Sequence, residues 1–209
     1  MQSRTIHIEG LDLAGKSTVC RKLVEKLGAR KRHNSLAEPN PIQIRAEALQ
    51  KADCLSPSTL GGVFFGSLLY DLEHFEEDGV PTVQDSSTIL RSIAYHSVAG
   101  DKALAEEFRK LLPVYPRFAI TCVISASREV RLKRLEGRIS RGNDMAEDYF
   151  VRDNYDLFKR MEDVLTETAV EHFGAVCIDT STLEMDGEKD RIADFIIRQA
   201  NALIGDERA

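Results

Sequence analysis

The sequence predicts one three-layer α/β domain in which a five-stranded parallel sheet is flanked by helices. Two observations support this prediction. Five short strand-like runs alternate with longer segments of helical periodicity, and such alternation requires crossovers that make the strands parallel. Three of the runs, residues 5–8, 118–124 and 175–178, read as continuous apolar strands, which is typical of strands covered by helices on both faces.

The elements follow one another in a regular order along the chain. The expected strands cover residues 5–8, 33–37, 80–83, 118–124 and 175–178. The expected helices cover residues 16–27, 42–52, 58–77, 87–98, 102–111, 127–141, 147–172 and 190–203. Turn-forming residues separate them, as at residues 56–58 before a helix start and at residues 142–143 after a basic helix. No repeat or linker interrupts this order, so residues 1–209 should form a single domain.

Composition and charge exclude several kinds of protein. The chain of 209 residues is long enough for one buried core and short for two full domains. Its net charge of −6 argues against a general surface for nucleic-acid polymers, so any anion site must be local. No apolar run approaches the roughly 20 residues of a membrane span, and the N-terminus has no signal-peptide pattern. The cysteines are widely spaced, as expected for reduced thiols, so we expect a cytoplasmic protein without membrane partners.

Residues 10–17, GLDLAGKS, fit the pattern G-x-x-x-x-G-K-[ST] of a phosphate-binding loop (P-loop). The segment follows a strand and opens a helix, which is the context that this motif requires. Glycines let successive backbone amides converge on an anion, and the helix N-terminus adds partial positive charge. Lys16 would act catalytically on the β- and γ-phosphates of ATP, and the Ser17 hydroxyl would ligate Mg²⁺. The residues expected to bind ATP in this loop are Gly10, Leu13, Ala14, Gly15, Lys16, Ser17 and Thr18.

Asp12 is unexpected inside an anion-binding loop, because two like charges about 4 Å apart repel by about 4 kcal/mol at a surface-like dielectric. The stretch IEGLDLAGKST resembles the first motif of thymidylate kinases, (F/I)-E-G-x-D-x-A-G-K-S-T. In that family this carboxylate faces the sugar 3′-hydroxyl of the acceptor nucleotide. The resemblance therefore implies that Asp12 binds the acceptor. The alternative is that Asp12 accepts hydrogen bonds that stabilise the loop.

Glu38 follows the second expected strand in the sequence Ala37-Glu38-Pro39, at an edge of the sheet where ligands bind. The pair resembles the E-P of thymidylate kinases and of deoxynucleoside kinases. In deoxynucleoside kinases this Glu is the general base for a sugar 5′-hydroxyl, which makes Glu38 a catalytic and acceptor-binding candidate. The chain continues with Asn40 where thymidylate kinases have G-G-T. A solvated turn residue is the alternative.

Residues 80–85, VPTVQD, form a strand-like run that ends in an acid, where P-loop enzymes keep the Asp that supports Mg²⁺. Asp85 is therefore a metal-binding and catalytic candidate. The longer stretch VPTVQDSSTILRSIAYH is similar to the thymidylate kinase run V-x-x-D-R-Y-x-x-S-x-x-A-Y-Q, with one residue inserted. The resemblance puts Tyr95 and His96 at the acceptor pocket, and the alternative is that they are core and surface residues of one helix. The family's Arg after the Asp is Ser86 here, and Arg45 or Arg91 could replace the missing arginines.

Residues 60–75, LGGVFFGSLLYDLEHF, are similar to the family's helix bearing L-L-F-x-A-D-R-x-x-H. Asp71 and Phe65 match and are expected at the acceptor, whereas the phosphate-binding Arg of the family falls on Leu72. A monophosphate is usually gripped by charge-assisted Arg pairs, so two such candidates are missing. Aromatic residues at this spacing could stack on a base or could be part of the core.

The segment SREVRLKRLEGRISR, residues 127–141, is rich in arginine, and its spacing puts Arg131, Arg134 and Arg138 on one helical face. Arg134, Arg138 and Asp144 approximate the R-x-x-x-R-x-x-x-x-D lid of the family. We expect an Arg-rich lid at about residues 134–147, with Arg134 binding ATP and both arginines stabilising charge on the transferring phosphoryl group. A solvated basic face is the alternative.

These motifs predict an ATP- and Mg²⁺-dependent P-loop kinase of the thymidylate kinase-like group. The acceptor would be a small molecule, most simply a nucleoside monophosphate such as dTMP. One alternative is a neutral hydroxyl compound, such as a nucleoside or sugar-like metabolite, with Glu38 as general base. Another is a non-catalytic NTP-binding module, which the absence of an [NT]-K-x-D motif disfavours. The long helices could supply the face of a homodimer.

Overall fold

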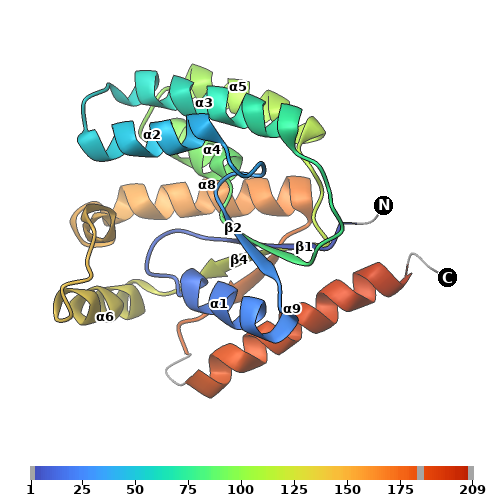
Figure 1. Cartoon of the computed structure of the whole chain (residues 1–209). Coiled ribbons are helices and arrows are strands. Elements are labelled where there is room, and N and C mark those ends of the chain that lie inside the picture. The colour runs from blue at the N-terminus through green and yellow to red at the C-terminus, as the bar shows by residue number, and fades with distance from the viewer. Residues whose placement is uncertain (1–2, 183–185, 207–209) are drawn as a thin grey trace.

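The computed structural model describes residues 3–182 and 186–206. In this part of the chain five parallel strands form one sheet in the order β2-β3-β1-β4-β5 (Figure 1). The strands are β1 Thr5–Glu9, β2 Arg30–His33, β3 Thr82–Asp85, β4 Ile120–Ser125 and β5 Val176–Asp179. The α-helices are α1 Lys16–Leu27, α2 Pro41–Ala52, α3 Pro57–His74, α4 Thr88–Val98, α5 Lys102–Leu111, α6 Arg128–Ile139, α7 Phe150–Asp153, α8 Tyr155–Phe173 and α9 Asp186–Asp206. Short 3₁₀ helices cover Leu112–Val114 and Ala146–Tyr149.

The helices cover both faces of the sheet, which confirms the three-layer α/β prediction. Helices α1 and α9 pack together on one face, and α8 and α4 cover the other, with α2, α3 and α5 stacked beyond them (Figure 1). On β1, Ile6 and Ile8 face the α1/α9 core, while His7 and Glu9 are buried on the opposite side. Two polar side chains are therefore buried against one face of the sheet directly before the phosphate loop. None of the described helices has the length and apolar character of a membrane-crossing segment.

Strand β2 differs most from the expectation. It covers Arg30–His33 rather than residues 33–37, and its sequence RKRH carries no apolar alternation. The strand lies at the edge of the sheet, and its pairing with β3 sets its place, with His33 opposite Asp85. Only Arg32 of this strand is buried. An edge strand that packs one side chain inward leaves little hydrophobic signal, which is why its position could not be read from the sequence.

The long helix expected over residues 147–172 is interrupted. Helix α7 ends at Asp153, and Asn154 takes a non-helical conformation before α8 begins. Val151, Phe158 and Leu165 are all buried, at intervals of seven residues. The apolar spacing thus continues across the break, and periodicity alone does not reveal it.

Gly10 offers a test of how tightly the phosphate loop is packed. Its φ is +142°, and a Cβ at this position would lie 2.2 Å from the carbonyl oxygen of Ile124 on β4. We expect Gly10→Ala to lower the free energy of unfolding by at least about 2 kcal/mol in urea denaturation. Gly62→Ala is the control, because a Cβ there meets open space on α3, and it should be neutral or stabilising by about 0.5–1 kcal/mol. Equal effects of the two substitutions would contradict this packing.

Candidate active site

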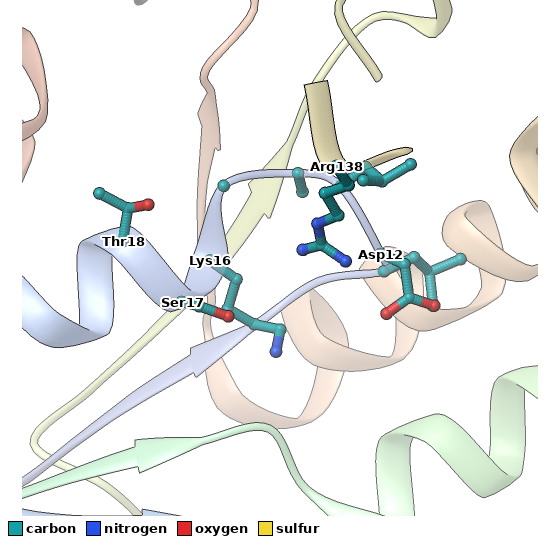
Figure 2. Close-up of a pocket in the computed structure, with 9 residues that line it drawn as sticks. Asp12, Lys16, Ser17, Thr18 and Arg138 are labelled. Carbon is teal, nitrogen blue, oxygen red and sulfur yellow. The ribbon is translucent and has the colours of Figure 1, made fainter. Parts of the chain in front are cut away.

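The phosphate loop connects β1 to α1 and surrounds a small cavity. Residues 11–18 and Arg138 line this cavity (Figure 2). Leu13 and Gly15 have φ values of +62° and +92°, which curl the backbone around the hollow. Figure 2 shows the Arg138 guanidinium reaching into the cavity between Asp12 and Lys16. The cavity therefore combines a curled backbone with cationic side chains, as an anion site requires.

Arg134 lies behind the loop. Its Nη1 donates to the carbonyl oxygen of Leu13 at 2.8 Å, and its Nη2 donates to that of Thr180 at 3.1 Å. The Thr180 hydroxyl in turn donates to the carbonyl oxygen of Ala14 at 2.6 Å. We expected Arg134 to close over the phosphates; in this structure its guanidinium instead binds the carbonyl oxygens of Leu13 and Thr180. Arg138 lines the cavity and also pairs with Asp148, which is not among the lining residues.

Asp85 ends β3 and is held between two lysines. Lys16 Nζ lies 2.8 Å from its Oδ1, and Lys31 Nζ lies 2.7 Å from its Oδ2. Burial raises the pKa of Asp85, but Lys16 and Lys31 reverse this effect and hold the pKa at about 2. Lys31 was not anticipated, because it belongs to the polar edge strand β2, and four consecutive polar residues RKRH were its only signal. The carboxylate is therefore fully charged and already neutralised on both oxygens.

A metal ion at this site would use oxygen donors. The Ser17 hydroxyl is exposed in the first turn of α1, and a hydroxyl with a carboxylate such as Asp85 suits Mg²⁺. Among the described residues, no group of three His, Cys, Asp or Glu side chains could hold a metal by itself. The remaining ligands would have to come from water and from phosphate oxygens.

At the start of the loop the wholly buried Glu9 pairs with Arg91, whose side chain is partly exposed. Glu9 accepts hydrogen bonds from the backbone N–H of Gly10 at 2.9 Å and of Ser87 at 2.8 Å. Arg91 reaches across from α4, with its Nε 3.5 Å from Glu9 and its Nη2 2.9 Å from the carbonyl oxygen of Gly10. Burial raises the pKa of Glu9, but His7, Arg91 and Lys16 outweigh burial and bring it to about 2.

The guanidinium of Arg91 also balances the negative charge of Asp12. Arg91 Nη2 lies 4.0 Å from the Asp12 carboxylate, and the two side chains are 32% and 39% exposed. Asp12 thus faces a cation on the outer rim of the cavity. The partial exposure leaves both groups accessible to a ligand that approaches the loop from this side.

Asp71 is wholly buried and holds the loop that carries Glu38. Its carboxylate accepts hydrogen bonds from Ser35 Oγ at 2.5 Å, Leu36 N at 2.9 Å, Ala37 N at 2.9 Å and Asn40 Nδ2 at 2.9 Å. We expected Asp71 at the acceptor; in this structure its carboxylate is fully covered and binds the loop instead. Glu38 itself is exposed beside this anchored segment.

His96 lies on α4, packs against α3 and α5, and is 3% exposed. A Cβ on Gly61 would lie 2.3 Å from its Nε2, and its Nδ1 accepts from the Asp101 N–H at 3.2 Å. Burial lowers the pKa of His96, so the ring is neutral at pH 7. Its expected place at the acceptor stays a prediction; in this structure the ring is enclosed by packed helices.

Phe65 and Tyr95 are partly buried in the same helical layer. Phe65 packs edge-on against Phe108 with ring centroids 5.2 Å apart, and Tyr95 packs edge-on against His96 at 5.1 Å. These contacts match the core alternative for the aromatic residues. The groups that the structure brings to one edge of the sheet are Asp12, Lys16, Asp85, Arg91 and Arg138.

Glu9 should make the stability of the fold depend on acid pH. Its pKa of about 2 lies below the ordinary value of 4.5, so the charged carboxylate stabilises the fold above about pH 4.5 and this contribution is lost as the pH falls toward 2. The loss for one such group is about 3 kcal/mol. We expect Glu9→Gln to flatten the pH dependence of the free energy of unfolding between pH 4.5 and 2. The exposed Glu73→Gln on α3 is the control and should leave the slope unchanged. An unaltered slope in Glu9→Gln would argue against a charged Glu9.

Solved structures with the same fold include kinases of two acceptor classes. The thymidylate kinase from Candida albicans is 18% identical, with a TM-score of 0.65 over 96% of this chain and 93% of that one. The deoxyadenosine kinase from M. mycoides, solved with the products dCMP and a flexible dCDP bound, is 18% identical, with a TM-score of 0.60 over 95% and 99%. The thymidylate kinase from Ehrlichia chaffeensis is 16% identical, with a TM-score of 0.55 over 95% and 98%. A comparison with curated proteins found no significant match.

The family model supplies the assignment that these distant structures alone do not. Residues 8–189 match the model described as thymidylate kinase, which spans most of the chain and includes the phosphate loop, Asp85 and α6. The chain therefore belongs to the thymidylate kinase family and is a P-loop nucleotide kinase.

Proposed function

We propose that this protein transfers the γ-phosphate of ATP, bound with Mg²⁺, to a nucleoside monophosphate, with dTMP as the simplest candidate. The position of Arg91 is the observation that supports a monophosphate as acceptor. Its guanidinium lies beside Asp12 on the rim of the phosphate loop, 4.0 Å from the carboxylate. A permanent cation next to a hydroxyl-binding acid suits a molecule that carries both a phosphate and a sugar hydroxyl.

ATP would bind with its phosphates in the cavity of the loop. The backbone amides and Lys16 would neutralise the phosphate oxygens, and Arg138 would cover them from α6. Mg²⁺ supplies further neutralisation of the phosphoryl charge, and Ser17 and Asp85 would hold it. Lys16 must then leave Asp85 for the phosphates, so ligand binding exchanges one ion pair for another.

The acceptor would approach from the side of Asp12 and Arg91. Asp12 would accept the hydrogen bond of a sugar hydroxyl, and the exposed part of Arg91 would pair with the acceptor phosphate. Arg91 would then take over the work of the arginines that the family carries at Ser86 and Leu72. Catalysis would consist of positioning and charge neutralisation, with water excluded when the site closes.

Glu38 supports a second candidate, a kinase of a neutral hydroxyl acceptor. Its carboxylate is exposed, and the adjacent residues are held rigidly through Asp71. A general base of this kind needs to be placed with little freedom, because proton transfer requires hydrogen-bond reach. The kinases that share the fold include one named for a nucleoside, deoxyadenosine.

An acceptor screen distinguishes the two candidates. ADP release would be followed with ATP·Mg²⁺ and a panel of nucleoside monophosphates, nucleosides and sugars. For a monophosphate kinase, we expect Arg91→Met to lower kcat/KM by about 10- to 100-fold and Glu38→Gln to change it much less. Arg21→Met, an exposed arginine on α1, is the charge-matched control. Arg91→Lys, which keeps the charge beside Glu9, controls for loss of stability.

The opposite pattern would overturn the monophosphate assignment. Turnover with nucleosides but not with monophosphates, together with a loss of several orders of magnitude in Glu38→Gln, would establish the neutral-hydroxyl reaction instead. Absence of turnover with every acceptor would contradict both candidates.

Lys31 should compete with the metal ion for Asp85. Its ammonium lies 2.7 Å from the carboxylate and its side chain is 43% exposed. We expect Lys31→Met to lower the Mg²⁺ concentration for half-maximal activity by about two- to fivefold, since a partly exposed ion pair is worth up to about 1 kcal/mol. Lys26→Met, which removes an ion pair with Asp194 on α9, is the control. An unchanged or higher Mg²⁺ requirement would show that Lys31 does not oppose metal binding.

A further inference from the structure

Arg131 on α6 is an almost completely buried arginine, with 1% of its side chain exposed. Its Nε donates to the carbonyl oxygen of Ala126 at 2.8 Å, and its Nη1 donates to the backbone carbonyl oxygen of Asp12 in the phosphate loop. Its Nη2 pairs with Glu162 on α8. The guanidinium also stacks 4.8 Å from the ring centroid of Phe158. One side chain thus joins α6, α8 and the loop.

A buried guanidinium of this kind needs an explanation. Burying an ion pair gives little stability compared with apolar residues of the same size, and removing one partner alone is strongly destabilising. Arg131 does not line the phosphate cavity, unlike Arg138 on the same helix. Its contact with the loop is instead made to a backbone carbonyl oxygen, so its effect on a ligand must pass through the shape of the backbone.

The planarity of the peptide bond specifies that effect. In a trans peptide the N–H points away from the preceding C=O, so a carbonyl oxygen that is bound on the outside directs the next amide to the inside. Arg131 binds the Asp12 carbonyl, Arg134 binds that of Leu13, and Thr180 binds that of Ala14. These contacts direct the amides of residues 13, 14 and 15 away from their side-chain partners.

Arg131 makes the first of these three contacts. It binds the carbonyl directly before Leu13, a residue with an unfavourable backbone conformation. Leu13 has a φ of +62°, a left-handed conformation that a leucine rarely adopts. The carbonyl of Asp12 belongs to the peptide that enters this residue, so fixing it fixes the orientation of the Leu13 amide.

We propose that Arg131, held in place by Glu162, is a positioning residue that orients the amides of the phosphate loop toward bound phosphate. The proposal rests on the proposed function, in that it takes the loop to bind the phosphates of ATP. Arg131 touches neither nucleotide nor metal, and it acts through the Asp12 carbonyl. Helix α8 is thereby connected to the phosphate site by the pair of Glu162 and Arg131.

The test uses the whole chain and two phosphate ligands, ATP and inorganic tripolyphosphate, with dissociation constants from calorimetry. Arg131→Met should weaken both ligands by about tenfold, the worth of one lost charge-assisted hydrogen bond. The same variant should unfold at a lower temperature, because the buried Glu162 loses its arginine and keeps only the 3.6 Å contact with the partly exposed Lys159 ammonium. The double variant Arg131→Met with Glu162→Met keeps the net charge and also removes the buried acid that has lost its arginine. It should recover thermal stability but still bind tripolyphosphate about tenfold more weakly.

Two controls separate positioning from charge and from stability. Arg128→Met removes an exposed positive charge from the same helix and should leave both affinities unchanged. Leu165→Ala destabilises α8 without touching Arg131 or the loop, and it should lower the melting temperature but not the affinity.

The outcomes are distinct. A double variant that binds both ligands as tightly as the wild type would overturn the role of Arg131 and leave the proposed function standing. Weakened binding in Leu165→Ala equal to that of the double variant would also overturn it, because stability alone would then explain the loss. A wild-type protein that binds neither ATP nor tripolyphosphate would overturn the proposed function together with this inference.

Discussion

The phosphate loop depends on side chains that bind its carbonyl oxygens from the outside, because its amides must face an anion on the inside. Arg91 from α4 donates to the carbonyl oxygen of Gly10, and Arg134 from α6 donates to that of Leu13. Ala14 is bound by Thr180, which directly follows β5. A curled backbone without these partners would leave buried carbonyl groups unsatisfied, at a cost comparable to a lost hydrogen bond for each. The arginines and the loop after β5 therefore maintain the shape that a phosphate needs.

The charges around the loop are balanced before any ligand arrives. Each acid near the cavity faces a cation: Glu9 and Asp12 face Arg91, Asp85 faces two lysines, and Asp148 faces Arg138. A phosphate ligand must therefore exchange partners with groups that are already paired. This arrangement explains how a chain with a net charge of −6 can hold an anion site, and why an acid inside the loop causes no unbalanced repulsion.

The motif at residues 10–17 and the alternation of strands and helices were sufficient to predict the three-layer fold, the phosphate loop and the family. These features are local or periodic, so a single sequence carries them. On the acceptor side the sequence gives residue types but not their burial. Asp71 matches a family position but is buried under the loop that carries Glu38, and His96 matches another but is enclosed by α3 and α5. A matching residue type says nothing of how far its side chain is covered by elements distant in sequence.

The sequence by itself determined that a loop with the phosphate-binding pattern connects a strand to a helix, since the loop, its lysine and its serine are contiguous. Only the tertiary structure decided what supports that loop and balances its charge. Arg91, Arg131 and Lys31 reach the site from α4, α6 and β2, and their partners lie many residues away in the chain. Long flexible side chains can reach several places, and which one they occupy depends on the packing of the helices and on the register of the edge strand.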